Sequence, residues 1–162
     1  MVALEKVTFI DWEFNVDKTA TLIGYQHAKA GSANYCTCTM CENFATYRHD
    51  IYPDVIKKLF EDLGIDYEKE AETYHIMKLD NGLHYYGAWF HFIGQIVKGK
   101  AAKISTANNS YNLDLFNITD YFNIGFHRDY SLSFFDKEKY ELVQVEFTVS
   151  IPWIIDKAKE PV

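Results

Sequence analysis

The sequence predicts an α+β fold in which a short helical pair, inserted early, precedes an antiparallel β-sheet or a small sandwich. Three observations predict it. Tyr and Phe are frequent, at 12 each in 162 residues, and both favour half-buried pleated surfaces. Residues 55–63 carry apolar side chains at helical spacing, and residues 143–151 alternate between apolar and polar side chains as strands do.

A chain of 162 residues most simply forms one domain, here residues 1–162. A domain of this size buries about 70% of its unfolded surface, so its core needs no disulfide staples. The chain has only 3 prolines and no biased tract, which argues against a long disordered linker.

The N-terminal region is expected to form strands. Residues 6–14 carry apolar side chains in two phases, which predicts one strand with a bulge or with burial on both faces. After a short turn, a second strand is expected in which alternate residues from Thr21 to His27 share one face. Residues 29–34 are expected to form a loop that leads into the cysteines.

A pair of helices is predicted next. Thr39 and Glu42 have the spacing of a capping box, so the first helix is expected to begin at Thr39. It would bury Phe44, Tyr47 and Ile51.

The second helix is the most strongly indicated element. Pro53 suits its first position and Gly64 its end. Its apolar face would be formed by Val55, Ile56, Leu59, Phe60 and Leu63.

A β-hairpin is predicted around Asn81-Gly82, the dipeptide that favours a two-residue type I′ turn. In the resulting register His75 and His84 are four residue pairs apart, about 13 Å, so they are not expected to act together. Aromatic residues fall on both faces, which indicates a central strand covered on two sides.

The C-terminal half is expected to contain further strands. The polar segment 99–110 is predicted to be a mobile loop, and strands are predicted over 113–126 and 130–135. The last strand, 143–151, would point its odd-numbered apolar residues inward and its even-numbered polar residues outward.

The charge balance excludes some partners. The chain has 16 basic and 23 acidic residues, for a net charge of −7. The densest basic group, Lys98, Lys100 and Lys103, is too small to follow a phosphate backbone, so nucleic acid is not an expected partner. Neither a signal peptide nor an uninterrupted apolar run of spanning length is present, so a membrane is not expected either.

All three cysteines lie within six residues, as Cys36, Cys38 and Cys41. Thiolates are preferred zinc ligands, and a loop entering a helix can turn three of them inward. A helix start also favours the thiolate form of Cys41. The sequence therefore predicts a zinc site in a reducing, cytoplasmic protein. The candidates for a fourth ligand are His27, His49, His75 and Glu42.

Two alternatives to a metal stay open at the cysteines. One is a redox-active or nucleophilic thiol, since Cys38 and Cys41 form a Cys-x-x-Cys pair. The other is three structural cysteines without chemistry.

Histidines in the predicted strands, His84, His91 and His127, could act as general bases in a cleft. Histidines that lie among aromatic residues are more often core residues with one ring nitrogen hydrogen-bonded. Aromatic residues in strands, such as Trp89, usually belong to the core as well. We therefore assign no catalytic residue.

Two further polar groups are interpreted as structural. Asn43 is expected to brace the cysteine loop by a local hydrogen bond. Acidic residues on and after the second helix are expected on a solvated surface that a partner could face. These residues are Asp54, Glu61, Asp62, Glu68, Glu70 and Glu72.

Five blocks of residues together carry a resemblance to a known group of proteins. They are Cys36 to Phe44, Tyr52-Pro53, Leu63 to Asp66, Glu70 to Glu72, and Tyr86 to Gly94. Over residues 34–97 the chain resembles a group of uncharacterised small bacterial proteins with a Cys-x-Cys-x-x-Cys-x-Asn-Phe motif. The resemblance implies a bacterial, cytoplasmic, stand-alone protein and assigns no activity.

The sequence favours a non-enzymatic, protein-binding module braced by a zinc-binding loop. Its acidic and aromatic surface would contact the partner. One version is an inhibitor of the immunity or antitoxin type that docks on a basic toxin. The alternative is a thiol- or zinc-dependent enzyme that uses Cys36, Cys38 and Cys41.

Overall fold

A computed structural model describes residues 3–128 and 132–162 of the chain. Strands β1 (Glu5–Phe9) and β2 (Trp12–Val16) come first. Helices α1 (Lys18–His27), α2 (Ser32–Tyr35), α3 (Thr39–Ile51) and α4 (Asp54–Leu63) follow. The remaining elements are β3 (Glu72–Lys78), β4 (His84–Lys98), β5 (Lys103–Ser105), β6 (Tyr111–Leu113), β7 (Phe116–Thr119), β8 (Phe122–His127), β9 (Leu142–Ile151) and the 3-10 helix η1 (Lys157–Lys159).

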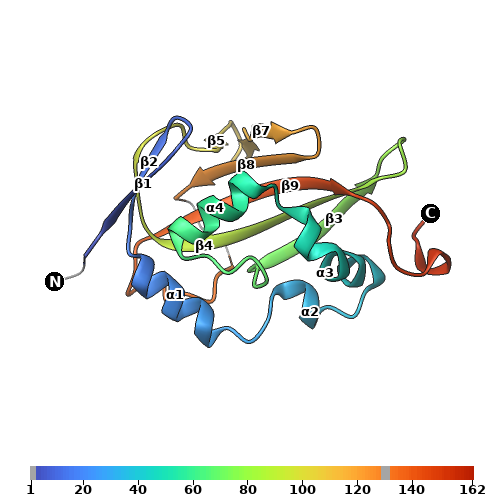
Figure 1. Cartoon of the computed structure of the whole chain (residues 1–162). Helices are drawn as coiled ribbons and strands as arrows, with labels where there is room; N and C mark the ends of the chain where they lie inside the picture. The colour runs from blue at the N-terminus through green and yellow to red at the C-terminus, as the bar shows by residue number, and fades with distance from the viewer. Residues whose placement is uncertain (1–2, 129–131) are drawn as a thin grey trace.

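The main sheet is antiparallel, with strand order β1-β2-β4-β9-β8-β7. Strand β3 pairs with the first half of β4, along the same edge that β2 occupies further on. Strands β5 and β6 form a separate ribbon. Figure 1 shows α4 lying across one face of the sheet and α1 along its edge. The α+β class and the antiparallel sheet are confirmed, although the helical insertion is longer than the predicted pair.

The first predicted strand, residues 6–14, is a hairpin instead. Phe9 and Trp12 are paired, and the two residues between them form the turn, where Ile10 has a φ of 53°. The change of hydrophobic phase in the sequence therefore marks a reversal of the chain.

The second predicted strand, from Thr21 to His27, is wrong because these residues belong to α1. Asp17 begins the helix by accepting a hydrogen bond from the backbone N–H of Ala20. Thr21 and Tyr25 are one helical turn apart, so they share a face. Residues separated by four positions fit a strand period and a helix period equally, and the sequence pattern could not separate the two.

Helix α1 completes the edge of β4 in the gap between β3 and β2. The Tyr25 hydroxyl donates to the carbonyl of His91 at 2.7 Å and accepts from its N–H at 3.2 Å. The N–H of Ile93 donates to Thr21 Oγ1 at 3.0 Å, and its carbonyl accepts from the N–H of Asp17 at 2.8 Å. Buried backbone groups need such partners, so helix side chains here take the place of a neighbouring strand.

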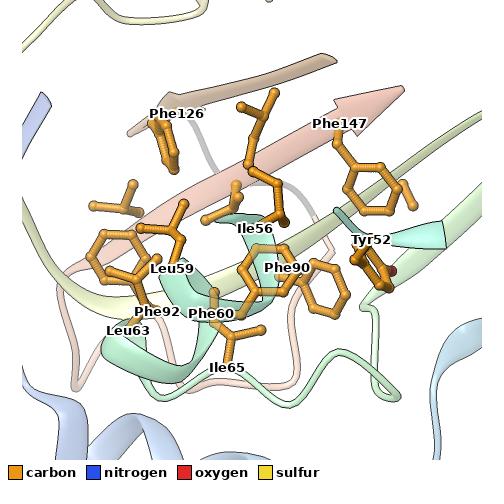
Figure 2. Packing of buried hydrophobic residues seen from close by; sticks show 14 of the residues in the cluster. Tyr52, Ile56, Leu59, Phe60, Leu63, Ile65, Phe90, Phe92, Phe126 and Phe147 are labelled. Carbon is orange, nitrogen blue, oxygen red and sulfur yellow. The ribbon is translucent and has the colours of Figure 1, made fainter. Parts of the chain in front are cut away.

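The core lies between α4 and the sheet, where Figure 2 shows phenylalanines of several strands against the helix. The predicted apolar face of α4 is confirmed except for Val55, which is half exposed. Pro53 is the N-cap rather than the first helical residue. Gly64 ends the helix in the left-handed conformation, with a φ of 80°, as predicted.

The β3–β4 hairpin exists, but its predicted register is wrong. His75 lies opposite Tyr86, and Lys78 lies opposite His84, with a bulge in β3 between these pairs. The connection extends beyond Asn81-Gly82 because Leu79 and Leu83 close it with a backbone hydrogen bond of 2.8 Å.

The later strands are confirmed in part. Residues 113–126 contain β7 and β8, and the predicted loop 99–110 contains β5. Residues 132–135 are not a strand, and residues 130 and 131 of that prediction lie outside the described residues. The last strand is confirmed, but its polar side chains Gln144, Glu146 and Thr148 are buried rather than solvated. Among the described helices, none combines the length and apolar character that crossing a membrane requires.

Candidate metal centre

The three cysteine sulfurs converge between the end of α2 and the start of α3. Their Sγ atoms all lie within 4.8 Å of one another. Cys36 Sγ and Cys38 Sγ are 3.1 Å apart, longer than the roughly 2.05 Å of a disulfide, and all three thiols are free. With Zn–S bonds of about 2.3 Å, tetrahedral geometry places sulfurs about 3.8 Å apart. The observed spacing therefore fits zinc after small side-chain movements.

Backbone amides point at the sulfurs. The N–H of Cys38 donates to Cys36 Sγ at 3.5 Å, and the N–H of Cys41 donates to Cys38 Sγ at 3.4 Å. Cys38 is therefore the N-cap of α3, and its carbonyl accepts from the N–H of Glu42. The predicted capping box at Thr39 is wrong by one residue, because a cysteine sulfur performs the capping.

The three thiols differ in exposure and acidity. Cys36 is exposed, Cys38 is half-buried and Cys41 is buried. Hydrogen bonds from the backbone and thiol of Cys38, and then from the thiol of Cys41, lower the pKa of Cys36. Burial, followed by the neighbouring thiols, raises the pKa of Cys41. The expectation of a thiolate at Cys41 is wrong for the free thiol, because desolvation raises its pKa.

Residues next to the cysteines anchor the start of α3. The Tyr86 hydroxyl donates to the carbonyl of Met40 at 2.8 Å. The fully buried Asn43 side chain donates to the carbonyl of Pro152 at 3.1 Å and accepts from the N–H of Ile154 at 2.8 Å. The expected local role of Asn43 is wrong, since its amide clamps the C-terminal segment onto α3.

The two helices that flank the cysteine loop are also tied together. Glu70, predicted on the surface, is 1% exposed and forms an ion pair with Arg48 of α3 at 2.8 Å. The same Glu70 oxygen accepts from the N–H of Ala33 in α2 at 3.0 Å. A Cβ on Gly31 would come within 2.5 Å of this carboxylate, so glycine is needed for the close approach.

None of the four candidate fourth ligands belongs to the cysteine cluster, which is the sole group of its kind among the described residues. His49 contacts the Tyr67 hydroxyl at 2.8 Å and the Glu68 carboxylate at 3.3 Å. Glu42 pairs with Lys159 at 3.5 Å. His27 lies at the end of α1.

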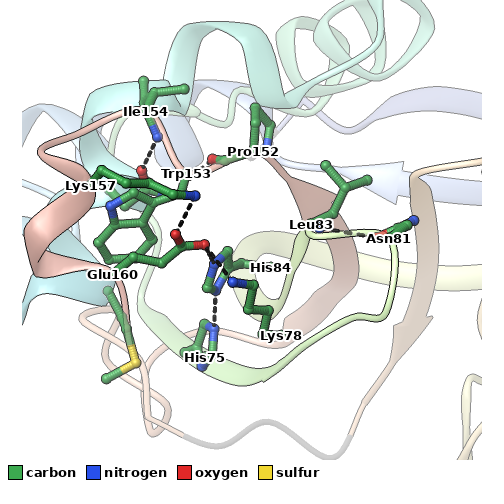
Figure 3. A network of polar contacts seen from close by, with 12 residues as sticks. His75, Lys78, Asn81, Leu83, His84, Pro152, Trp153, Ile154, Lys157 and Glu160 are labelled. Carbon is green, nitrogen blue, oxygen red and sulfur yellow. Dashed lines mark hydrogen bonds and ion pairs between the residues drawn. The ribbon is translucent and has the colours of Figure 1, made fainter. Parts of the chain in front are cut away.

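The fourth candidate, His75, belongs to a second polar cluster (Figure 3). His75 Nε2 lies 2.8 Å from His84 Nδ1, and His84 Nε2 lies 2.8 Å from Glu160 Oε1. Lys78 and Lys157 also pair with Glu160. The predicted separation of about 13 Å is wrong, because the longer hairpin loop and the bulge bring the two histidines together.

The hydrogen bonds define the tautomers of this cluster. A carboxylate only accepts, so when both rings are neutral His84 donates through Nε2 and accepts from His75 at Nδ1, which leaves Nδ1 of His75 as a lone pair. Hydrogen bonds from His84, Lys157 and Lys78 lower the pKa of Glu160 to about 2. Burial and the neighbouring His84 lower the pKa of His75. The cluster thus fastens the C-terminal segment to β3 and β4.

A third polar cluster crosses the sheet over strands β4, β9 and β8. His91 Nε2 contacts Gln144 Oε1 at 3.0 Å, Gln144 Nε2 donates to Glu146 Oε1 at 2.6 Å, and His127 Nε2 contacts the same oxygen at 2.8 Å. All four residues are buried. Sequence reasoning missed this row because the pairing of β4, β9 and β8 creates it. Burial lowers the pKa of His91 to about 4.

In sequence and structure comparisons, the chain matches no protein family, no curated protein and no solved structure. Its function is therefore inferred from the chemistry of its own side chains.

Proposed function

We propose that this protein binds one zinc ion through Cys36, Cys38 and Cys41, and that the zinc-bound loop braces a protein-binding module. The observation that carries the proposal is the convergence of the three sulfurs within 4.8 Å. Zinc prefers thiolate ligands in tetrahedral geometry, and a ligand from outside this triplet would fill its fourth position. A reducing cytoplasm, which we also propose, would keep the thiols available.

The position of the loop supports a bracing role. Zinc would link Cys36 at the end of α2 to Cys38 and Cys41 at the start of α3. Both helices are fixed nearby, by Glu70 and by Asn43 respectively. Metal binding would therefore add its free energy to the folded arrangement of the loop.

Zinc analysis combined with thiol titration tests this proposal. The chain has 3 cysteines, so every thiol counted belongs to the site. We expect one zinc per tag-free chain, with thiols that react slowly until a chelator is added. Cys41→Ser should lose the metal, whereas Thr39→Ser, at the position after Cys38, should retain it. Three freely reactive thiols in protein prepared with zinc would refute the site.

The proposed partner is a basic protein that docks on the outer face of α4, where Asp54, Glu61 and Asp62 outnumber the lysines Lys57 and Lys58. Asp54 and Glu61 are exposed on this helix, and the whole chain carries a charge of −7. Charge complementarity of this kind raises association rates and rejects wrong partners. An inhibitor of the immunity or antitoxin type is one version of this proposal.

Matched charge reversals test the docking face. A partner captured from native lysate should be lost with Glu61→Lys and retained with Glu138→Lys, which makes the same charge change at another exposed position. Capture should also weaken from low to moderate salt. Equal behaviour of the two variants, or no specific partner at either salt concentration, would refute docking on α4.

A second candidate function, thiol- or zinc-dependent catalysis, is favoured by the exposed position of Cys36 beside Cys38. A thiolate at the surface can attack an electrophile, and a three-ligand zinc can activate water at its open position. Alkylation followed by mass spectrometry separates the candidates. Cys36 reacting far faster than the other two thiols would support a nucleophile, whereas uniform protection by zinc would support the brace.

A further inference from the structure

We propose that a cavity where β4 and β8 end binds a small ligand that carries a phosphate or a similar doubly charged oxyanion. The cavity has a volume of about 410 Å³, within the range of small-molecule sites. It involves none of the cysteines and does not depend on the zinc site.

Three chain segments build the cavity. The end of β4 and the next residue supply residues 96–99, the connection to β5 and its first residue supply Ala101 and Lys103, and the end of β8 and the next residue supply His127 and Arg128. The connection is held against β8 because the N–H of Ala102 donates to the carbonyl of Phe126 at 2.8 Å. The cavity is therefore fixed to the central strands of the sheet.

The charge of the lining is the opposite of that of the whole protein. Lys98, Lys103 and Arg128 line the cavity, and no carboxylate is among the described lining residues. The Arg128 guanidinium donates to the carbonyl of Ile96 at 2.7 Å, which orients it, while Lys103 Nζ lies 4.1 Å from the Tyr111 ring. Within the described part of the chain, Lys98 forms no ion pair. A cleft lined by one sign of charge concentrates counter-ions.

His127 adds a buried, directional group to the lining. It is 2% exposed, and its Nε2 contacts Glu146 Oε1, which also accepts a hydrogen bond from Gln144. Its Nδ1 has no hydrogen-bond partner among the described residues, although such an atom normally has one when buried. A protonated ring would donate this hydrogen bond to an oxyanion.

These groups favour a doubly charged oxyanion over a carboxylate. Arginine presents a planar fork that matches two oxygens of a phosphate, and lysines add point charges around it. Lys98 and Arg128 together carry two positive charges, one more than a single carboxylate neutralises. The size of the cavity favours a small ligand rather than a nucleic-acid strand.

Titration of the full chain with inorganic phosphate, followed by amide NMR shifts of residues 96–103, tests the proposal at constant ionic strength. The chain supplies a matched pair of variants. Lys98→Gln removes a lining cation, whereas Lys100→Gln makes the same charge change two residues away, where Lys100 pairs with Asp114 outside this cavity. We expect Lys98→Gln to weaken phosphate binding about fivefold and Lys100→Gln to change it less than about twofold.

A His127 variant and two competing anions complete the test. His127→Asn should weaken binding as well, and a thermal melt establishes that this variant remains folded. Acetate should compete poorly and sulfate well. Absence of saturable shifts, equal effects of Lys98→Gln and Lys100→Gln, or acetate binding as tight as that of phosphate would each overturn the proposal.

Discussion

His75 and His84 face each other across the β3–β4 hairpin, with Nε2 of one 2.8 Å from Nδ1 of the other. The far nitrogen of His84 reaches Glu160, near the end of the chain (Figure 3). A fully buried imidazole thus joins the hairpin to the C-terminal segment.

Replacement of His84 should destabilise the protein. His84→Ala would leave a cavity and remove both hydrogen bonds, which predicts a loss of about 2–4 kcal/mol in urea denaturation. Lys159→Gln changes an exposed residue of the same segment and should cost less than about 0.5 kcal/mol. If the two variants were equally stable, the His84 contact would not fasten the C-terminal segment.

Tyr25→Phe should reduce stability by about 1–3 kcal/mol, because it leaves the N–H and the carbonyl of His91 without partners. Tyr35→Phe removes a hydroxyl from a side chain that is 66% exposed and should have no measurable effect. Chemical denaturation of both variants checks the difference. A Tyr25→Phe protein as stable as the wild type would show that the edge contact adds nothing to stability.

Acidification should destabilise the protein through His91. Its pKa is lowered to about 4 in the folded protein, whereas an unfolded histidine titrates near 6.5. Between these values the unfolded chain binds more protons, so the free energy of unfolding falls as the pH is lowered from about 6.5 to 4. The expected loss is up to about 3 kcal/mol.

Denaturation curves across this pH window check the His91 contribution. His91→Gln should flatten the dependence, whereas His49→Gln, at an exposed position, should leave the slope unchanged. An identical slope in both variants would assign the pH dependence to other groups.

Glu70→Gln should destabilise the fold by about 3–5 kcal/mol, because Arg48 would remain buried without a counter-charge. Glu68→Gln, two residues earlier and exposed, is the control and should change stability by less than about 0.5 kcal/mol. Thermal or urea melts measure both. Combining Glu70→Gln with Arg48→Met should cost less than the sum of the single changes, and strict additivity would contradict a direct interaction.

Elements whose burial follows from local spacing could be predicted from the sequence. Helix α4 repeats its apolar face every three or four residues and ends at Gly64, so its pattern is self-contained. The cysteine cluster was predictable for the same reason, because its three thiols are separated by only two and three positions. The sequence could not show which other side chains lie near these thiols, because spacing along the chain does not give distances between separate elements.

Elements that depend on distant partners were misread. Thr21 and Tyr25 face the edge of a strand that occurs some 70 residues later, so their spacing alone does not distinguish a helix from a strand, and the Asp17 N-cap was the one local signal that was overlooked. Likewise, Gln144 and Glu146 alternate like solvated strand residues, yet His91 and His127 on the neighbouring strands pair with them. Cross-strand register decides such clusters, and one bulge or a longer loop changes it.

The docking of α1 against β4 has a consequence for solubility. The longest strand of the sheet would otherwise present unpaired N–H and C=O groups between β2 and β3, a template on which another chain could add a strand. Helix α1 occupies these groups with a hydroxyl of Thr21 and the phenol of Tyr25. Undocking this one helix would therefore expose an aggregation-prone edge while the rest of the sheet stayed paired. By covering this edge, α1 prevents another chain from pairing with β4.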